Sequence, residues 1–252
     1  MTITKKTTKR VAVLGDGLTA RSVFSSLDKL NYTASSPEGA DVVIASPGIP
    51  PKNYPTCDAP IISEIEFTYL EMKSRGTLPR LIAVTGTNGK STVTSMIAHI
   101  LDCPYAGNIG VPFVEFIDKK VECLVLELSS FQLETCFEFC PEIAVLLNIT
   151  PDHLSRHHTL EAYSLAKARL FRSMGDDGVI IYNDEDDLVT SVVAESPVHK
   201  QSFSKLPDMS KLKLNVLGEH NKLNAAAAIQ ACIAYGLPED LCFDRLSSYV
   251  GL

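Results

Sequence analysis

The feature that most constrains this chain is a glycine-containing turn, Gly86–Gly89, between an apolar run and a helical pattern. The run is Leu81–Thr85, and the helical pattern covers Ser91–Leu101. Glycines let consecutive backbone N–H groups converge on an anion at a helix N-terminus, where the helix dipole also favours negative charge. Lys90 and Ser91 complete the pattern of a phosphate-binding loop. The stretch therefore predicts a nucleotide-binding α/β domain.

Each residue type in this loop has an expected task. Lys90 is predicted to reach the β- and γ-phosphates, and the Ser91 hydroxyl to bind Mg²⁺. The spacing differs from G-x-x-x-x-G-K-[ST], because Val84 stands where the first glycine would be. The alternative is a tight turn with a capping serine and a solvated lysine. The candidate phosphate-binding residues are Gly86, Thr87, Asn88, Gly89, Lys90, Ser91 and Thr92.

Further apolar runs alternate with helical patterns after the loop. The runs are Cys123–Leu128, Ile143–Leu147 and Val179–Tyr182, and the helical patterns are Leu160–Arg172 and Asn224–Tyr235. Near-continuous apolar strands alternating with helices predict a mostly parallel sheet covered on both faces. A break at Gly76–Pro79 separates this unit from the residues before it. We expect an α/β protein with domains at 1–78 and 79–252, a small Rossmann-like unit followed by a central P-loop ATPase-like unit.

The first unit opens on a second glycine turn. A strand at Arg10–Leu14 precedes Gly15–Gly17, and a helix is expected over Leu18–Leu30. This fits the dinucleotide fingerprint, but a dehydrogenase also needs an acid at the end of a second strand. Tyr32–Glu38 is too short and polar to indicate a clear strand. A nicotinamide-dependent oxidoreductase is therefore the less favoured interpretation of Gly15–Ala20.

The remainder of this unit holds a strand and a capped helix. Asp41–Ala45 is a short apolar run that ends at Ser46-Pro47-Gly48. Ser63 and Glu66 have the spacing of a capping box, which predicts a helix from that point to about Arg75.

Composition excludes several other classes of protein. Hydrophobic residues make up 45% of the 252, too many for an intrinsically disordered chain. No apolar run approaches the roughly 20 residues that span a bilayer, and the polar, basic N-terminus shows no secretory signal. A net charge of −7 argues against a nucleic-acid-binding surface. Seven cysteines at scattered positions indicate reduced thiols, and so a cytoplasmic protein.

The loop sequence V-T-G-T-N-G-K-S-T resembles the ATP loop of the Mur ligase family, which includes folylpolyglutamate synthetase. These enzymes use Mg²⁺ and ATP to join an amino acid to a carboxylate through an acyl phosphate. The resemblance implies an ATP-dependent amide ligase that acts in peptidoglycan precursor synthesis and cell-wall biogenesis.

A second segment resembles one member type more than the others. Glu127 to Glu134, E-L-S-S-F-Q-L-E, is similar to the ligases that add D-glutamate to UDP-N-acetylmuramoyl-L-alanine. By that resemblance Ser129 and Gln132 contact the substrate. A carboxylate at the carboxyl end of a parallel strand beside a phosphate loop also suits Mg²⁺, so Glu127 is a candidate metal ligand. The alternative is a glutamate at a strand end exposed to water.

The resemblance also supplies a second metal ligand and a modified lysine. N-I-T-P-D-H at 148–153 resembles the family's N-x-x-x-D-H segment, so His153 is implied as a ligand of a second Mg²⁺. Lys167 matches the family lysine that is carbamylated, whereas the sequence alone favours a surface lysine on an amphipathic helix. The implied metal ligands are Ser91, Glu127, His153 and Lys167, and with Lys90 the last three are the implied catalytic residues. His157 and His158 leave a transition-metal site open as an alternative.

The remaining implied contacts are to the nucleotide and the UDP-sugar. L-G-E-H-N-K-L-N at 217–224 matches a family segment in which Asn221 and Asn224 meet the adenine, and helix capping is the alternative for these asparagines. The turn at Gly15 is implied to receive the diphosphate of the UDP-sugar. The other implied substrate-binding residues are Leu18, Thr19, Ser46 and Asn108.

The family has a C-terminal domain that binds the incoming amino acid, and no segment of these 252 residues resembles it. We therefore expect the isolated chain to be inactive as a ligase, and to be monomeric. The alternatives are another Mur-type ligase, including a folylpolyglutamate synthetase-like enzyme, and a nucleotide-binding switch module without transfer activity.

Overall fold

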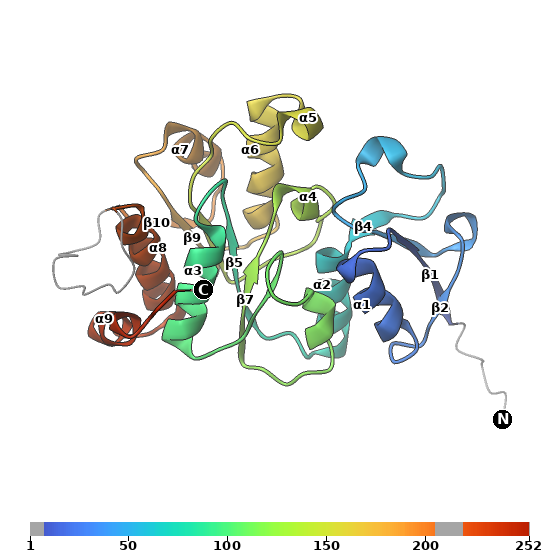
Figure 1. Ribbon diagram of the computed structural model, residues 1–252, viewed down its shortest axis with the longest axis horizontal. Coiled ribbons are helices and arrows are strands. Elements are labelled where there is room, and N and C mark those ends of the chain that lie inside the picture. The colour runs from blue at the N-terminus through green and yellow to red at the C-terminus, as the bar shows by residue number, and fades with distance from the viewer. Residues whose placement is uncertain (1–7, 205–218, 252) are drawn as a thin grey trace.

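The computed structural model describes residues 8–204 and 219–251. These residues form a four-stranded sheet of order β2-β1-β3-β4 and a six-stranded sheet of order β10-β9-β8-β5-β7-β6. All the strand pairs with a defined register are parallel, which confirms the predicted α/β class. The smaller sheet lies at one end of the molecule and the larger sheet at its centre (Figure 1). The basic N-terminal residues 1–7 and the pair 217–218 of the asparagine-containing segment lie outside the described residues.

The four-stranded sheet is built from the first 75 residues of the chain. Its elements are β1 (Lys9–Leu14), α1 (Leu18–Leu27), β2 (Tyr32–Ala34), β3 (Val42–Ala45), β4 (Ile61–Ser63) and α2 (Glu64–Arg75), with 3₁₀ turns at Pro37–Gly39 and Pro51–Asn53. The predicted helix start is confirmed, because the Ser63 side chain accepts a hydrogen bond from the backbone N–H of Glu66. The reciprocal half of the predicted capping box does not form, because the Ser63 N–H donates to the Thr135 carbonyl instead of to Glu66. The expectation for Tyr32–Glu38 was wrong, because its first three residues form β2 and pair with β1.

The six-stranded sheet carries the phosphate-loop candidate on its central strand. Its strands are β5 (Arg80–Thr85), β6 (Tyr105–Gly107), β7 (Cys123–Glu127), β8 (Ile143–Leu146), β9 (Val179–Tyr182) and β10 (His199–Ser202). The chain runs from β5 to the edge strand β6 and back through β7, and then continues on the other side of β5 through β8 to β10. Ligands of open parallel sheets bind at the carboxyl ends of the strands where the order reverses. That point is the carboxyl end of β5.

The helices of this unit cover both faces of its sheet. They are α3 (Lys90–Leu101), α4 (Ser130–Leu133), α5 (Leu154–His157), α6 (Leu160–Ala168), α7 (Asp187–Ala194), α8 (Glu219–Tyr235) and α9 (Glu239–Ser247), with 3₁₀ turns at Phe113–Phe116 and Arg169–Phe171. Successive strand residues face opposite sides of a sheet. Ile82 and Val84 of β5 accordingly pack with α3, α8 and α9, whereas Leu81 and Ala83 pack with the cluster that includes α2, α6 and α7. Helix boundaries differ from prediction mainly where α1 ends at Leu27 and α8 begins at Glu219.

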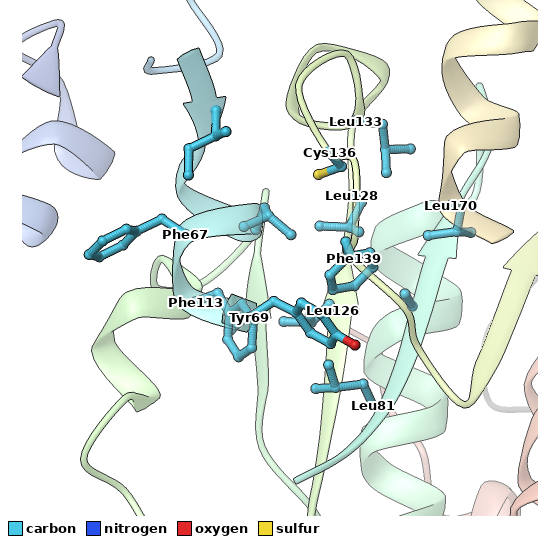
Figure 2. Packing of buried hydrophobic residues seen from close by; sticks show 14 of the residues in the cluster. Phe67, Tyr69, Leu81, Phe113, Leu126, Leu128, Leu133, Cys136, Phe139 and Leu170 are labelled. Carbon is cyan, nitrogen blue, oxygen red and sulfur yellow. The ribbon is translucent and has the colours of Figure 1, made fainter. Parts of the chain in front are cut away.

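Helix α2 joins the two sheets into one hydrophobic core. Phe67 and Tyr69 of this helix lie with Phe113, Phe139 and residues of β5 and β7 in a single cluster (Figure 2). The same cluster contains Val11 of β1, so it extends from the small sheet to the large one.

Two buried carboxylates at the start of α2 reinforce this junction. Glu64 is 2% exposed and its Oε1 accepts the backbone N–H of Val114 at 2.6 Å. Glu66 is 1% exposed and accepts the N–H groups of Glu138 and Phe139 at 2.7 and 2.9 Å. Burial raises the pKa of Glu64 to about 7. The donors that satisfy both carboxylates come from the unit that holds the large sheet.

Within the described residues, no helix combines the length and the apolar character needed to cross a bilayer.

Candidate functional site

The turn after β5 has the backbone geometry of an anion-binding loop. Gly89 adopts φ +83°, and a Cβ built there would lie 2.5 Å from the Asn224 Oδ1 atom, so only glycine fits this position. Helix α3 begins at the next residue, Lys90. The first N–H groups of a helix have no partner within it. Lys90, Ser91 and Thr92 therefore present backbone donors and hydroxyl groups at the end of the turn.

Asn148 fixes the first half of the turn. Its Oδ1 atom accepts the N–H groups of Thr87 and Asn88 at 3.0 and 2.8 Å, and its Nδ2 donates to the Asn88 carbonyl at 3.0 Å. One amide side chain thus takes the place of three local backbone partners. Because the amides of Thr87 and Asn88 are used in this way, the donors that face an anion are those at the start of α3. Asn148 opens the N-I-T-P-D-H segment, but the sequence predicts no role for it.

The Lys90 side chain folds over the turn. Its Nζ atom donates to the carbonyl oxygens of Gly86 and Thr87 at 3.0 and 2.7 Å. Burial lowers the pKa of Lys90, and the negative charges of Glu127 and Asp152 partly offset that shift. The Lys90 side chain is therefore held against the turn by two backbone carbonyls.

Lys167 lies beneath the same loop and is not a surface residue. It is 1% exposed on α6, and its Nζ atom donates to the Gly86 carbonyl at 2.7 Å. The Nζ atom also lies 4.4 Å from the centre of the Tyr163 ring. Burial, with a further contribution from the Lys90 charge, lowers the pKa of Lys167 to about 7. A large fraction of this amine is consequently neutral near neutral pH.

Glu127 ends β7 with its carboxylate buried and only partly hydrogen-bonded. It is 1% exposed, and Oε1 accepts the Asn108 Nδ2 group at 2.7 Å. Its Oε2 atom is also buried and has no hydrogen-bond partner among the described residues. An unpartnered buried carboxylate oxygen is costly unless a cation approaches it. Glu127 is thus a suitable ligand for a divalent cation, held in orientation by Asn108.

His153 stands at the rim of the site. It adopts φ +52° immediately before α5, and its Nε2 atom lies 3.5 Å from the Asp152 carboxylate. Its ring lies 4.8 Å from the Phe131 ring, centre to centre. The side chain is 48% exposed, so the imidazole is open to a ligand.

Tyr163 lies between the phosphate-loop candidate, His153 and Lys167, and no role was predicted for it from the sequence. Its hydroxyl lies 3.3 Å from Thr87 Oγ1, and its ring contacts both His153 and Lys167. Its place on α6, one helical turn before Lys167, is the only sequence signal that could have drawn attention to it.

Ser129 and Gln132 serve a local structural purpose at the start of α4. The Ser129 hydroxyl accepts the Gln132 N–H, and the Gln132 Oε1 atom accepts the Ser129 N–H in return. This reciprocal pair is a capping box. It fixes the direction in which the chain leaves Glu127.

The predicted residues of the small sheet gather at one turn. Ser46 follows β3 and packs against Gly15. A Cβ atom added at Gly15 would lie only 2.7 Å from the Ser46 hydroxyl oxygen. The Ser46 hydroxyl is buried and has no partner among the described residues. Leu18 and Thr19 begin α1 beside the same turn, and Leu18 is exposed. A polar atom without a partner beside a helix N-terminus indicates a place for a polar ligand.

A cavity of about 630 Å³ opens on the other side of the phosphate loop. Asn221 and Asn224 lie one turn apart on α8, as expected, and the Asn224 amide donates to Asn221 Oδ1 at 3.3 Å. Phe203 and Tyr249 line the cavity with them, and neither was foreseen. A cavity with aromatic walls, amide groups and a phosphate loop at one end suits a nucleoside.

The residues from different elements therefore form two groups. Lys90, Glu127, Lys167, Asn108 and His153 belong to the carboxyl edge of the large sheet, and Leu18, Thr19 and Ser46 to that of the small sheet. The described residues contain no cluster of three or more His, Cys, Asp or Glu side chains suited to a metal. His157 is buried against Ser130 and Glu134, which leaves the transition-metal alternative without support.

Comparison with known proteins defines the class to which this fold and site belong. Residues 84–208 match the Mur ligase middle domain. The fold is similar to that of a solved UDP-N-acetylmuramate:L-alanyl-gamma-D-glutamyl-meso-diaminopimelate ligase from Neisseria meningitides. The TM-score is 0.65 at 18% identity, over 96% of this chain and 98% of that one. The chain belongs to the Mur ligase family.

Within the family, the sequence is similar to proteins named UDP-N-acetylmuramoylalanine--D-glutamate ligase. The one from Caldicellulosiruptor bescii is 34% identical over 90% of this chain and 57% of its own length. The one from Rickettsia prowazekii is 35% identical over 84% of this chain and 54% of its own length. The chain thus spans little more than half the length of the curated relatives that it matches.

The lowered pKa of Lys167 predicts a specific dependence of stability on pH. In buffer freed of CO₂, the free energy of unfolding should rise from pH 7 towards the ordinary lysine pKa of 10.5. In that range the unfolded chain still binds a proton that folded Lys167 has released. Urea unfolding at pH 7, 8 and 9 measures the slope. Lys167→Met should reduce it and the exposed control Lys120→Met should not, whereas an equal slope in both variants would contradict the assignment.

Proposed function

We propose that this chain is the nucleotide- and UDP-sugar-binding part of an ATP-dependent ligase that adds D-glutamate to UDP-N-acetylmuramoyl-L-alanine. The observation that carries the proposal is the charge arrangement around the turn after β5. Two lysines converge there on the Gly86 carbonyl, while Glu127 keeps one buried oxygen without a partner. A phosphate and a divalent cation are the two charges that this arrangement lacks.

The reaction is an amide ligation through an acyl phosphate, in peptidoglycan precursor synthesis. ATP would supply the γ-phosphoryl group to the substrate carboxylate and leave as ADP, and Mg²⁺ would supply neutralisation of charge on that group. The D-glutamate amine would then attack the acyl carbon, displace inorganic phosphate and lose a proton to solvent. Such catalysis rests on positioning and electrostatic stabilisation. The residues proposed to hold two Mg²⁺ ions are Ser91, Glu127, His153 and Lys167. Those proposed to contact the UDP-sugar substrate are Leu18, Thr19, Ser46, Asn108, Ser129 and Gln132.

The phosphates and the adenine of the nucleotide are proposed to bind at two neighbouring places on this chain. Lys90 exchanges its loop carbonyl partners for phosphate oxygens, while Asn148 keeps the turn rigid. Asn221 and Asn224 face the adenine in the cavity beside the loop, where Phe203 and Tyr249 form its apolar walls. Amide side chains can satisfy both the donor and the acceptor edge of a base.

Lys167 is proposed to act as a carbamate. The neutral fraction of its amine can attack CO₂: a C–N bond forms as one C–O π bond of CO₂ breaks, and the displaced proton goes to solvent. The product is an anion in place of a buried cation beside Lys90, which relieves the repulsion between the two lysines. It also gives Mg²⁺ the oxygen ligand that it prefers.

The remaining proposals concern the domain boundary, the oligomeric state and the cellular compartment. We place the domain boundary near Leu78, and we expect a monomer that works in the cytoplasm. All seven cysteines are free thiols, which fits a reducing compartment. A nicotinamide-dependent oxidoreductase is disfavoured, because Ser35, and not an acid, follows β2.

Lys90→Ala should weaken binding of Mg·ATP by about tenfold or more, because it removes a charge-assisted hydrogen bond to phosphate. Isothermal titration calorimetry of the purified chain measures the affinity. The exposed Lys120→Ala is the matched control, and equal binding by wild type and Lys90→Ala would show that the turn is not a phosphate loop.

The chain of residues 1–252 should bind Mg·ATP and UDP-N-acetylmuramoyl-L-alanine but join D-glutamate to it at no useful rate. The curated relatives are nearly twice as long, and closure of further protein around a site protects reactive intermediates. The assay follows ADP and ligated product with all substrates present. Robust ligation would place the amino-acid site within these residues.

Carbamylation predicts a ¹³C carbonyl resonance when the chain is equilibrated with ¹³C-bicarbonate. The signal should strengthen with Mg²⁺ and disappear in Lys167→Met, while Lys120→Met retains it. A spectrum that is the same for Lys167→Met and wild type would rule out a carbamate at this lysine.

A further inference from the structure

An arginine of α5 connects the two carboxyl edges on which the site residues lie. Arg156 is 10% exposed, and its Nε and Nη2 atoms bind both oxygens of Glu134 at 2.5 to 3.2 Å. Its remaining nitrogen, Nη1, donates to the Pro47 carbonyl at 3.1 Å. Pro47 belongs to the Ser46–Pro50 loop that follows β3 of the small sheet. One guanidinium group therefore binds residues of both units.

On the large-sheet side, several contacts hold Arg156 and Glu134 in place. The guanidinium lies over the Phe131 ring, 4.4 Å from its centre. Glu134 is held from its other side by His157, whose Nδ1 atom is 3.4 Å from Oε1 and whose Nε2 atom lies 2.9 Å from Ser130 Oγ. A series of polar contacts thus runs from Ser130 on α4 through His157, Glu134 and Arg156 to the Pro47 carbonyl.

The small-sheet side of the contact carries a candidate ligand group. Ser46, the neighbour of Pro47, has a buried hydroxyl without a partner among the described residues, and it faces the Gly15 turn. In the large-sheet unit, Arg156 lies on α5, one helical turn after His153, which caps the same helix. The hydrogen bond from Arg156 to Pro47 therefore connects the segment that holds His153 with the Ser46–Pro50 loop.

We propose that Arg156 is a positioning residue that sets the Ser46–Pro50 loop, and the substrate bound there, against the phosphoryl-transfer side of the site. The identity of that substrate rests on the proposed function. A planar guanidinium can bind a carboxylate with two nitrogens and still donate with the third, whereas a lysine ammonium has neither the shape nor the reach. Arg156→Lys should therefore keep the charge and lose the bond to Pro47.

The first measurement is hydrogen exchange of the loop, which needs no ligand. The N–H groups of Ser46 and Ile49 donate to Leu14 and Ser46 carbonyls at 2.9 and 3.0 Å, so both are protected. Their exchange should accelerate in Arg156→Lys, while that of the β5 amides stays unchanged. Arg169→Lys is the matched control, because Arg169 also donates to a backbone carbonyl and lies near an aromatic ring, but away from this loop.

The second measurement separates positioning from general damage. In Arg156→Lys the Kd for UDP-N-acetylmuramoyl-L-alanine should rise about tenfold, the loss of roughly one hydrogen bond to a charged group, and the Kd for Mg·ATP should change less than about twofold. Unchanged exchange at Ser46 and Ile49, or an equal loss of both affinities, would overturn the proposal.

A second variant tests the same contact independently of the first. If Arg156→Lys does not fold, Glu134→Gln tests the same contact, because it weakens the hold on Arg156 without removing the guanidinium. It should show the same faster loop exchange to a smaller degree, and unchanged exchange would overturn the proposal. If the wild-type chain does not bind the UDP-sugar, the proposed substrate is wrong, and the exchange measurement still decides whether Arg156 holds the loop.

Discussion

Two lysine side chains donate to a single carbonyl oxygen, that of Gly86, and the proposed function depends on that convergence. Neither group is in bulk water, so each raises the cost of the other's charge. The turn can impose the arrangement only because its backbone is fixed by Asn148 from one side and packed against Asn224 from the other. An anion at the loop, or conversion of Lys167 to an anion, relieves the repulsion.

The fold was predictable where burial produces a continuous apolar run. The runs beginning at Leu81, Cys123, Ile143 and Val179 all proved to be strands of the large sheet, and the Ser63 cap marked the start of α2 correctly. The strands that escaped prediction are short or polar. In β2, for example, only Tyr32 is buried, and the strand owes its conformation to backbone pairing with β1. Such pairing leaves little trace in side-chain patterns.

The same contrast holds for the site. The positions of the glycine turn after β5 and of Glu127 at the end of β7 could be predicted because both are local in sequence, and their ligands stay a prediction. Asn148, Tyr163 and Arg156 could not, because their partners lie 60 or more residues away at Thr87, Asn88 and Pro47. For Lys167 the periodicity of its helix favoured a surface position and was misleading, because tertiary packing buries the side chain. The family resemblance, and not the helix periodicity, singled out Lys167 as a candidate site residue.

Helix α2 has a consequence for how the chain folds. It is contiguous in sequence with the small sheet, but its buried glutamates obtain their donors from the large unit, and its aromatic residues share that unit's core. A chain cut near Leu78 would leave two carboxylates without their donors and an apolar helix face in water. We therefore expect the two sheets to unfold together, because the boundary near Leu78 falls within a shared hydrophobic core.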